Sequence, residues 1–500
     1  MTKRAYLLLL LLLAGLNQAV AASLADRIEA LIAASPSASG AFWGIQAVDL
    51  SGGATLFELN ANHFFIPASN TKLFTTAMAL SRLGPEFTFQ TRVLATVPID
   101  ANGTIAGDLR LLGGGDPNLS ARPIPYQKGA ITGNPLIAIE DLADQIAAKG
   151  VKRVDGNILG DDSWYVWEPY APGWALDDPL YDYGAPVSAL TLSDNTLTLN
   201  VLPGKHEGDL AALALKPALE YYRIDNRIRT VAAGGERRIH YDRPPGTLDL
   251  ELWGTIPLRD RGEDLLLGIE DPAQFAAMAL RQALEDRGIA VQGKALALHV
   301  SPNQLPSLVQ AAEPEAPAGI ELARRVSAPL LEDLRITDKV SQNLHAEMAL
   351  RAVARARRNL GSREAGLAEL KDFLIEAGVA ADQYGINDGS GLSRQNLVTP
   401  ATVVKLLRFM YQSPARENWI SLLPVGGQDG TLEKRFSDPA MAGRVHAKTG
   451  SVAHVSALSG YFRRAGGEWV AFSILVNNFN GPTAEIRNVM DRICATIMEE

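Results

Sequence analysis

The pattern of this sequence changes twice along the chain, and this limits what the chain can fold into. Helix-like and strand-like segments alternate from Leu24 to Gly84, and helical patterns return after Ser327. Between about residues 88 and 318, short alternating segments with many Gly and Pro turns predict β-rich structure. Because 500 residues are too many for one compact core, we expect an α/β domain built from residues 22–90 and 319–500 and interrupted at 91–318 by two inserted β-rich domains.

Local patterns predict that the α/β domain holds a mostly antiparallel sheet flanked by helices. The predicted elements are a helix at residues 24–33, a β-hairpin of 42–50 and 54–60, and strands at 457–462 and 469–476. Ser327 is the expected N-cap of one returning helix, and Thr399-Pro400 opens another. A last helix has one apolar face, for which packing against the sheet is preferred over peripheral contact with a membrane. This face comprises Ile486, Val489, Met490 and Ile493.

The first 21 residues have the layout of a secretory signal peptide. Lys3 and Arg4 precede an apolar run from Leu7 to Leu13, and small residues close on Ala19-Val20-Ala21. No second apolar run approaches the roughly 20 residues that a membrane span needs. We therefore expect a soluble mature chain that begins near Ala22 and works in the periplasm.

Charge and residue counts argue against several functional classes. A formal net charge of −9 leaves no basic surplus to neutralise phosphates, which argues against nucleic-acid binding. The arginines at 351, 355, 357 and 358 are expected on the solvated face of a helix. Cys494 is the single cysteine, so no intramolecular disulfide can form. The seven histidines show no His-Glu-x-x-His spacing, so no metal site is expected.

Ser69 and Lys72 place a hydroxyl and an amine three residues apart at the start of a predicted helix. A serine hydroxyl needs a base to become a nucleophile, and a lysine can be that base once burial or a neighbouring cation lowers its pKa. The helix N-terminus and the Ser69 backbone N–H favour an oxyanion. Alone, this Ser-x-x-Lys motif is weak evidence for an active site, because a chain of this length is expected to contain it by chance about once or twice.

Lys448-Thr449-Gly450 is more specific, with roughly 0.1 occurrence expected by chance, and it precedes a predicted strand. At a sheet edge, the ammonium and hydroxyl can hold a carboxylate, while Gly450 leaves room for a peptide backbone to approach. Ser451 can offer its N–H as a second oxyanion donor.

The third expected element, Ser-x-Asn, has two candidates. Ser193-Asp194-Asn195 runs into the two-residue alternation of residues 196–201, which predicts a strand within the insertion. Ser341-Gln342-Asn343 lies instead between helical patterns of the returning domain, and we prefer Ser341 and Asn343.

In this order, the three elements resemble the penicillin-recognising serine peptidases and β-lactamases. More narrowly, the mature chain resembles the class C low-molecular-mass penicillin-binding proteins, a D-alanyl-D-alanine carboxypeptidase and endopeptidase family whose fold is a penicillin-binding, transpeptidase-like domain. The separation of about 270 residues between Ser69 and Ser341 is typical of the domains inserted in that family. Further stretches similar to the family lie at 113–117, 160–163, 183–186 and 388–392.

The resemblance implies that Ser69 is acylated, that Lys72 is the general base and that Ser341 relays a proton to the leaving group. It also implies that Asn343 contacts the substrate amide, and that Lys448 and Thr449 bind the carboxylate of the leaving D-alanine. Asp162 is expected to contact the substrate's diamino-acid side chain. The implied partners are peptidoglycan peptides ending in or cross-linked through D-Ala, with β-lactams as covalent inhibitors; no cofactor is implied.

Competing functions share some of these features. A β-lactamase uses the same acylating machinery, but its motifs usually lie closer together, and no glutamate-bearing loop can be assigned here. A non-catalytic wall-binding scaffold would not need all three motifs. A Ser-His-Asp hydrolase is not favoured, because Gly-x-Ser-x-Gly does not surround Ser69. Preference for a terminal D-Ala or a cross-link, oligomeric state and the role of the insertions stay open.

Overall fold

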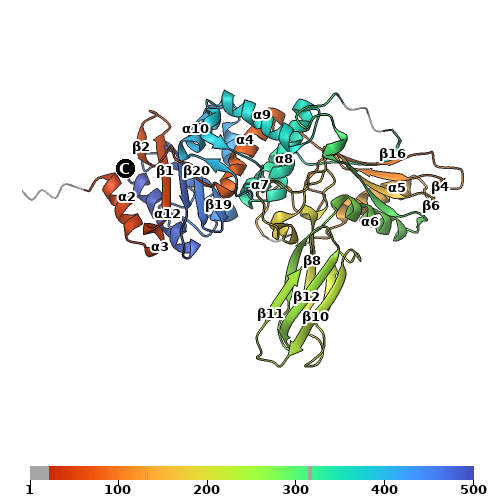
Figure 1. The fold of residues 1–500 in the computed structure, drawn as a ribbon. Helices are drawn as coiled ribbons and strands as arrows, with labels where there is room; N and C mark the ends of the chain where they lie inside the picture. The colour runs from red at the N-terminus through yellow and green to blue at the C-terminus, as the bar shows by residue number, and fades with distance from the viewer. Residues whose placement is uncertain (1–21, 130, 132, 314–317) are drawn as a thin grey trace, which may run out of the picture.

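The structure is a computed structural model that describes residues 22–129, 131, 133–313 and 318–500. The predicted signal peptide, residues 1–21, lies outside the described residues. Among those described, no helix has both the length and the apolar character needed to cross a membrane. The α/β body occupies one end of the molecule and the insertion the other, with one part of the insertion projecting sideways (Figure 1).

A five-stranded antiparallel sheet forms the centre of the α/β body. Its order, β19-β20-β21-β1-β2, places strands from both ends of the chain side by side, and β1 pairs with β21 from Phe42 opposite Asn477 to Asp49 opposite Val470. The predicted hairpin and both predicted C-terminal strands are confirmed. The strands are β1 (Phe42–Asp49), β2 (Thr55–Leu59), β19 (Val445–Val452), β20 (Val455–Arg463) and β21 (Trp469–Asn477).

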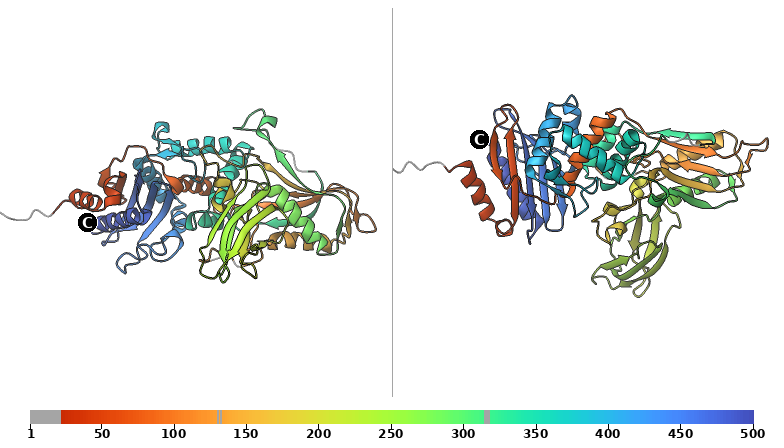
Figure 2. Two further views of the ribbon diagram at one scale, coloured as in Figure 1. Left: turned by 60° about the horizontal axis from the view of Figure 1, so that its bottom comes forward. Right: turned by 45° about the horizontal axis from the view of Figure 1, so that its top comes forward.

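One face of this sheet is covered by the first and last helices, which lie side by side in each view (Figures 1 and 2). They are α2 (Leu24–Ala33), α3 (Pro36–Ser39) and α12 (Thr483–Met498). The predicted apolar face of the last helix packs here: Ile486 and Ile493 are fully buried in a core shared with strand residues such as Phe472. The membrane interpretation of that face is therefore wrong, because the sheet already covers it.

The opposite face of the sheet supports the helices that carry the first two motifs. Alternate strand residues, such as Ala457 and Tyr461, share a core on this side with Leu73 and Leu344 of the helices. The helices are α4 (Thr71–Leu83), α7 (Leu330–Lys339), α8 (Asn343–Arg358), α9 (Arg363–Glu376), α10 (Pro400–Gln412) and α11 (Arg416–Leu422), with the short pair β17 (Tyr384–Gly385) and β18 (Leu397–Val398) beside them.

The insertion leaves and rejoins the α/β body at one place. Strand β3 (Gln90–Ala95) starts it, strand β16 (Ile320–Val326) ends it, and the two pair antiparallel with Gln90 opposite Val326. The chain therefore returns to the body beside its point of departure. Helix α7 follows directly, so the second motif is delivered next to the first despite the long sequence between them.

The first part of the insertion is built on a five-stranded sheet of order β15-β7-β5-β3-β16. It includes helices α5 (Ile137–Ala148) and α6 (Pro272–Glu285), which the sequence interpretation did not identify. For α6 a signal was present, because Asp271 is an N-cap whose side chain accepts the Gln274 N–H, and Pro272 occupies the first turn. The remaining strands here are β4 (Thr104–Ile105), β5 (Leu109–Leu112), β6 (Arg153–Val154), β7 (Ile158–Val166), β14 (Ala290–Val291) and β15 (Ala295–Val300).

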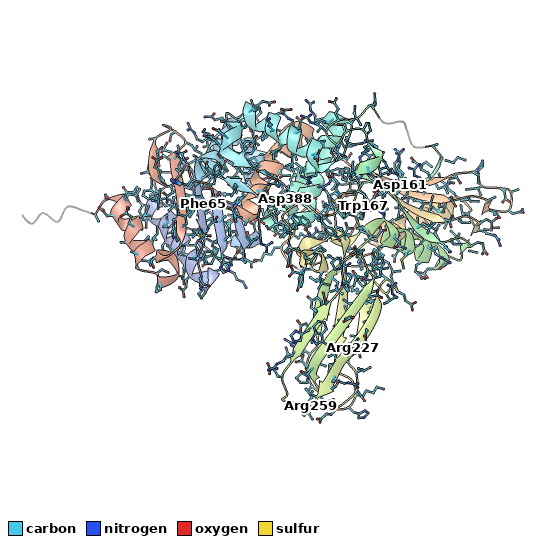
Figure 3. All side chains as sticks on the ribbon, viewed as in Figure 1. Phe65, Asp161, Trp167, Arg227, Arg259 and Asp388 are labelled. Carbon is cyan, nitrogen blue, oxygen red and sulfur yellow. The ribbon has the colours of Figure 1, made fainter. Side chains whose placement is uncertain are left out.

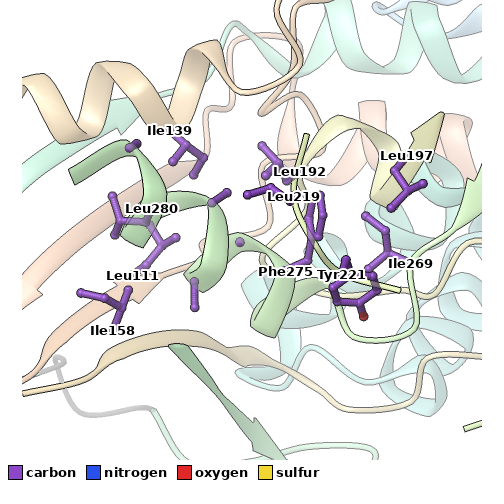
Figure 4. Close-up of a cluster of buried hydrophobic side chains, with 14 of the residues drawn as sticks. Leu111, Ile139, Ile158, Leu192, Leu197, Leu219, Tyr221, Ile269, Phe275 and Leu280 are labelled. Atoms are coloured by element: carbon purple, nitrogen blue, oxygen red, sulfur yellow. The ribbon is translucent and has the colours of Figure 1, made fainter. Parts of the chain in front are cut away.

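The second part projects from the molecule as two three-stranded sheets, visible from each side (Figure 2). Its strands are β8 (Thr196–Leu202), β9 (Ala212–Lys216), β10 (Arg223–Val231), β11 (Arg238–Asp242), β12 (Asp249–Pro257) and β13 (Glu263–Gly268). Both parts contribute to one hydrophobic core, in which Leu111 and Phe275 of the first part are continuous with Leu197 and Ile269 of the second (Figure 4).

Three local predictions have mixed outcomes. Thr399 caps α10 as predicted, because its side chain accepts the Thr402 N–H. The prediction for Ser327 is wrong: α7 begins at Leu330 after Pro329, and the Ser327 hydroxyl instead accepts the Phe89 N–H at 2.9 Å. The solvated-face prediction is wrong for Arg351, which is 1% exposed and donates to Glu347 of the same helix at 3.1 Å.

Candidate active site

Ser69 lies in a short 3-10 turn, η1 (Ala68–Asn70), that leads directly into α4. This places Ser69 and Lys72 on one face of the first helical turn, where the Lys72 Nζ lies 3.0 Å from the Ser69 Oγ. Ser69 is half-buried, whereas Lys72 is fully buried. The hydroxyl is therefore open to a substrate, while the amine reaches it from inside the protein.

The Lys72 amine has two further partners, and both are oxygen acceptors. Its Nζ lies 2.6 Å from the Asn343 Oδ1 and 2.7 Å from the Ser390 carbonyl oxygen. A neutral amine has two N–H groups and one lone pair. If the two carbonyl oxygens take the N–H groups, the lone pair is left facing the Ser69 hydroxyl proton, which is the arrangement a general base requires.

Electrostatics favour the neutral form of this amine. Burial lowers the pKa of Lys72 well below its usual range, and the positive charge of Lys448 lowers it further. The carboxylates of Asp388, Asp338 and Glu347 act in the opposite direction but do not restore the pKa. The buried amine is thus able to accept a proton.

The second motif lies against both lysines. The Ser341 Oγ accepts a hydrogen bond from the Lys448 Nζ at 2.8 Å, and Asn343 donates through its Nδ2 to the Tyr183 carbonyl oxygen at 2.8 Å. Ser341 has a φ of 64°, a left-handed conformation that costs a non-glycine residue about 1–3 kcal/mol. The surroundings of this serine must therefore hold it in place.

Lys448 carries the third motif on β19, the edge strand of the central sheet. It is fully buried, and its Nζ also donates to the Thr449 carbonyl oxygen at 2.8 Å. Burial lowers the pKa of Lys448 while Asp338 opposes that shift, and burial raises the pKa of Asp338. The two lysines and Asp338 therefore form one buried cluster of titratable groups behind the half-buried hydroxyl groups of Ser69 and Ser341.

Gly450 lets strand β19 approach the nucleophile. A Cβ at this position would lie 2.8 Å from the Pro67 carbonyl oxygen and 3.1 Å from the Ser69 nitrogen, closer than side chains tolerate. The Asn70 Nδ2 adds a hydrogen bond of 3.0 Å to the Lys448 carbonyl oxygen. The first half of the β19 edge is covered, because the Ala447 N–H donates to the Pro424 carbonyl oxygen at 3.0 Å. Farther along, Thr449 is half-buried and Ser451 exposed, so this part of the edge can receive a peptide.

A glycine-rich turn at 388–391 completes the surroundings of Lys72, a role that sequence reasoning missed. Its Ser390 carbonyl faces the Lys72 amine, and the Glu347 carboxylate fixes the turn by accepting the N–H groups of Gly389 and Ser390, each at 2.8 Å. A Cβ at Gly391 would lie 1.9 Å from the Ala68 carbonyl oxygen. The glycine-rich pattern of the turn was the available signal, and it was noted only as a similarity.

The hydrogen bonds of Asp162 run to residues of the insertion and not to these side chains. Asp162 lies on β7 of the insertion and is 1% exposed, and its carboxylate accepts from the Ser188 Oγ at 2.9 Å and contacts the His299 Nδ1 at 2.8 Å. In Figure 3, Asp161 of the same strand lies in the insertion and Asp388 in the α/β body. The predicted contact of Asp162 with the substrate's diamino-acid side chain therefore stays a prediction. Tyr183 of the insertion contacts the site through the Asn343 Nδ2.

Two large cavities of the structure do not coincide with these residues. Two cavities of about 590 and 650 Å³ share Trp164, Tyr165 and Arg355 in their walls, between the insertion and α8, and contain none of the predicted site residues. The alternative Ser193 donates its hydroxyl to the Pro135 carbonyl oxygen at 2.8 Å, within the insertion. The residues that meet at one point are thus Ser69, Lys72, Ser341, Asn343 and Lys448.

Comparison with known sequences identifies related proteins over nearly the full chain. Residues 24–497 match the D-Ala-D-Ala carboxypeptidase 3 (S13) family. A D-alanyl-D-alanine carboxypeptidase of Actinomadura sp. (strain R39) is 36% identical over 481 residues, which cover 94% of this chain and 84% of that protein. The D-alanyl-D-alanine carboxypeptidase DacB of Haemophilus influenzae is 26% identical over 448 residues, covering 87% of this chain and 85% of that protein.

Solved structures share the fold. The crystal structure of penicillin binding protein 4 (dacB) from Haemophilus influenzae superposes with a TM-score of 0.80 and 23% identity, covering 95% of this chain and 99% of that chain. A complex of the same protein with a β-lactam gives a TM-score of 0.76 and 22% identity, over 95% and 100% of the two chains. The predicted fold, an antiparallel sheet flanked by helices with a β-rich insertion, is confirmed.

Proposed function

This chain belongs to the D-Ala-D-Ala carboxypeptidase 3 (S13) family, and from that premise we propose that it is a serine DD-peptidase acting on peptidoglycan stem peptides, as carboxypeptidase, endopeptidase or both. One observation carries the assignment of the site: the buried Lys72 amine is held by the Asn343 and Ser390 oxygens so that it faces the Ser69 hydroxyl. Ser69 is then the acylated nucleophile and Lys72 its base.

The reaction begins when the Ser69 hydroxyl gives its proton to the Lys72 amine. The Ser69 Oγ bonds to the carbonyl carbon of the penultimate D-alanine, and the charge that develops on the carbonyl oxygen is stabilised by the backbone N–H groups of Ser69 and Ser451. The carbon–nitrogen bond to the last residue then breaks. The Ser341 hydroxyl gives its proton to the leaving amine and takes up the proton that Lys72 received, so that Lys72 is neutral again and the net transfer is one proton from Ser69 to that amine.

Residues of β19 and of the second motif bind the substrate. The Lys448 ammonium and the Thr449 hydroxyl bind the terminal carboxylate, and Asn343 contacts the substrate amide. The free part of the β19 edge, from Thr449 onward, pairs with the peptide backbone as an added strand, while Gly450 lets β19 lie close to Ser69. Water finally adds to the acyl carbon, which releases the peptide as a carboxylic acid and returns the proton to Ser69.

Acylation at Ser69 tests this assignment. Purified mature protein is incubated with penicillin, and mass spectrometry is expected to find one covalent adduct on the peptide that contains Ser69. Ser69→Ala and Ser341→Ala should lose or severely slow adduct formation, whereas Ser193→Ala should not. Loss of acylation in Ser193→Ala but not in Ser341→Ala would reverse our choice of the second motif.

Digestion of defined muropeptides distinguishes the remaining functions. Release of D-alanine from uncross-linked pentapeptides indicates carboxypeptidase activity, and cleavage of cross-linked dimers indicates endopeptidase activity. Hydrolysis of penicillin faster than that of a D-Ala-D-Ala peptide would instead favour a β-lactamase. A protein that forms no adduct and cleaves no peptide would be a wall-binding scaffold.

We also propose that the chain is exported and acts in the periplasm, with peptidoglycan peptides as substrates and β-lactams as covalent inhibitors. The basic residues Lys3 and Arg4, the apolar run after them and the family's cell-wall substrate support this location. Fractionation of cells, with N-terminal sequencing of the mature protein, is expected to recover it outside the cytoplasm with a new terminus near Ala22. A cytoplasmic, uncleaved chain would contradict the proposal.

A further inference from the structure

The second candidate motif, Ser193-Asp194-Asn195, has an unusual backbone. All three residues have left-handed φ angles, of 50°, 57° and 53°. Successive non-glycine residues in this conformation are strained and persist only where their surroundings hold them. Here Ser193 donates to the Pro135 carbonyl oxygen at 2.8 Å, and the Asn195 Nδ2 donates to the Pro186 carbonyl oxygen at 2.8 Å. The outer two residues thus fix the turn within the insertion and leave Asp194 at its tip.

The Asp194 carboxylate crosses to the α/β body and contacts the second motif. Its Oδ2 accepts a hydrogen bond from the Gln342 Nε2 at 3.0 Å, and its Oδ1 lies 3.0 Å from the His345 Nε2. Gln342 is the middle residue of Ser341-Gln342-Asn343, and its own Oε1 caps α8 by accepting the Leu344 N–H at 3.0 Å. One carboxylate of the insertion therefore holds Gln342, the N-cap of α8, and His345 in the first turn of that helix.

Charged neighbours hold this carboxylate in turn. Arg122, also in the insertion, pairs with Asp194, and the second ring nitrogen of the fully buried His345 lies 2.7 Å from the Asp333 Oδ1 on α7. Burial alone would lower the pKa of His345, but Asp333 and Asp194 raise it to about 9. The imidazolium thus bridges a carboxylate of α7 and one of the insertion.

We propose that Asp194 is a positioning residue for the reaction: by holding Gln342 and His345, it fixes the strained turn that aims Ser341 at Lys448 and Asn343 at Lys72. The inference rests on the proposed function of the site. The insertion then affects the rate of the reaction, because the carboxylate that fixes the geometry of the second motif belongs to the insertion. Without this contact, the left-handed Ser341 has lost one of the anchors that keep it from relaxing.

Asp194→Asn tests this directly, because it keeps the shape of the side chain and removes its charge. The matched control is Asp161→Asn, which removes a buried carboxylate that pairs with Arg110 inside the insertion and does not touch the second motif. Stopped-flow acylation by excess fluorescent penicillin gives the first-order acylation rate constant and the dissociation constant of the preceding complex. Thermal unfolding reports the stability of each protein.

We expect Asp194→Asn to lower the acylation rate constant about 10- to 100-fold, since misplacement of a reacting group by 1 Å can cost that much. The dissociation constant should rise by a smaller factor than the rate constant falls, because Asp194 holds Asn343 in place but does not contact Lys448 or Thr449. Asp161→Asn should change the rate by less than about twofold whatever its effect on the melting temperature. Equal effects of the two substitutions on the rate would overturn the proposal.

Exchanging the donor and the acceptor of the Asp194–Gln342 hydrogen bond provides a second test. If Asp194 had only a general structural role, this exchange would not restore the acylation rate. In the double variant Asp194→Asn and Gln342→Glu, the donor and acceptor of the contact exchange sides, and the pair borders a cavity of about 220 Å³ that leaves room for it. The double variant should acylate faster than Asp194→Asn alone. If it is no faster, the proposal is wrong. A wild-type protein that is not acylated at all would refute the proposed function instead.

Discussion

Replacing Lys72 by arginine tests whether Lys72 acts as a proton acceptor, because arginine can still donate hydrogen bonds but cannot accept a proton. An arginine keeps N–H donors for the Asn343 and Ser390 oxygens, but its pKa lies so high that it carries no lone pair for the Ser69 proton. Positioned general bases contribute about 100- to 10,000-fold to rates, which corresponds to about 3–5 kcal/mol. Because the Ser69 hydroxyl has Lys72 as its neighbouring base, we expect a loss in the upper half of this range.

The pH dependence of the wild-type protein supplies an independent check. Burial, aided by the charge of Lys448, lowers the pKa of Lys72, and only the neutral amine can take a proton. The acylation rate should therefore be constant above the lowered pKa and fall as the pH drops through it. The inflection should lie well below 10.5, the usual lysine pKa.

The assay is single-turnover acylation by fluorescent penicillin between pH 5 and about 10. Lys339→Arg is the matched control, since Lys339 is also buried but pairs with Asp429 at 2.6 Å, an ion pair that an arginine can keep. Both variants are compared by thermal unfolding to confirm that they fold. Acylation of Lys72→Arg within about tenfold of the wild type would refute the assignment of Lys72 as the base.

Three further predictions test other parts of the structure. Gly450→Ala should slow acylation at least about tenfold, because the new Cβ would meet the Pro67 carbonyl oxygen at 2.8 Å; unchanged acylation would contradict the close approach of β19. Asp162→Asn should cost about 1–3 kcal/mol in urea unfolding yet leave KM for a D-Ala-D-Ala peptide unchanged; a large rise in KM would restore its predicted substrate contact. The pKa of His299 is raised from 6.5 to about 10 by Asp162 and Asp271, against the effect of burial. Its stabilising contribution is therefore complete below pH 6.5 and lost as the pH rises through about 10, so the unfolding free energies of wild type and His299→Gln should converge over that window.

Patterns of short range were sufficient for much of the fold. The hairpin of β1 and β2 follows from two alternating segments around Ser51-Gly52-Gly53, and Thr399-Pro400 marks the start of α10 because cap and first turn are adjacent in sequence. The spacing of Ser69 and Lys72 was likewise readable, since one helical turn alone brings them together. In each case the interacting residues are near neighbours along the chain.

Contacts between residues far apart in the sequence could not be predicted. The Ser390 carbonyl and the Glu347 carboxylate act on Lys72 only because α8 and the turn at 388–391 lie beside α4. Asp162 resembles a free acidic residue in the sequence, but in the structure Ser188 and His299 occupy its carboxylate. Partners of this kind leave no local signal, because burial and pairing are set by other segments.

The sequence by itself determined that this chain has a Ser-x-x-Lys motif at a helix start, a lysine-threonine-glycine strand and a long insertion between the parts of one domain. Only the tertiary structure decided how these parts meet. The antiparallel pairing of β3 with β16 returns the chain to its starting point, and the Ser193–Asn195 turn, set aside as the catalytic motif, reaches across to hold the motif that was preferred to it. The physical reason is that hydrogen bonds and buried charges act over a few ångströms in space, whatever the distance along the chain.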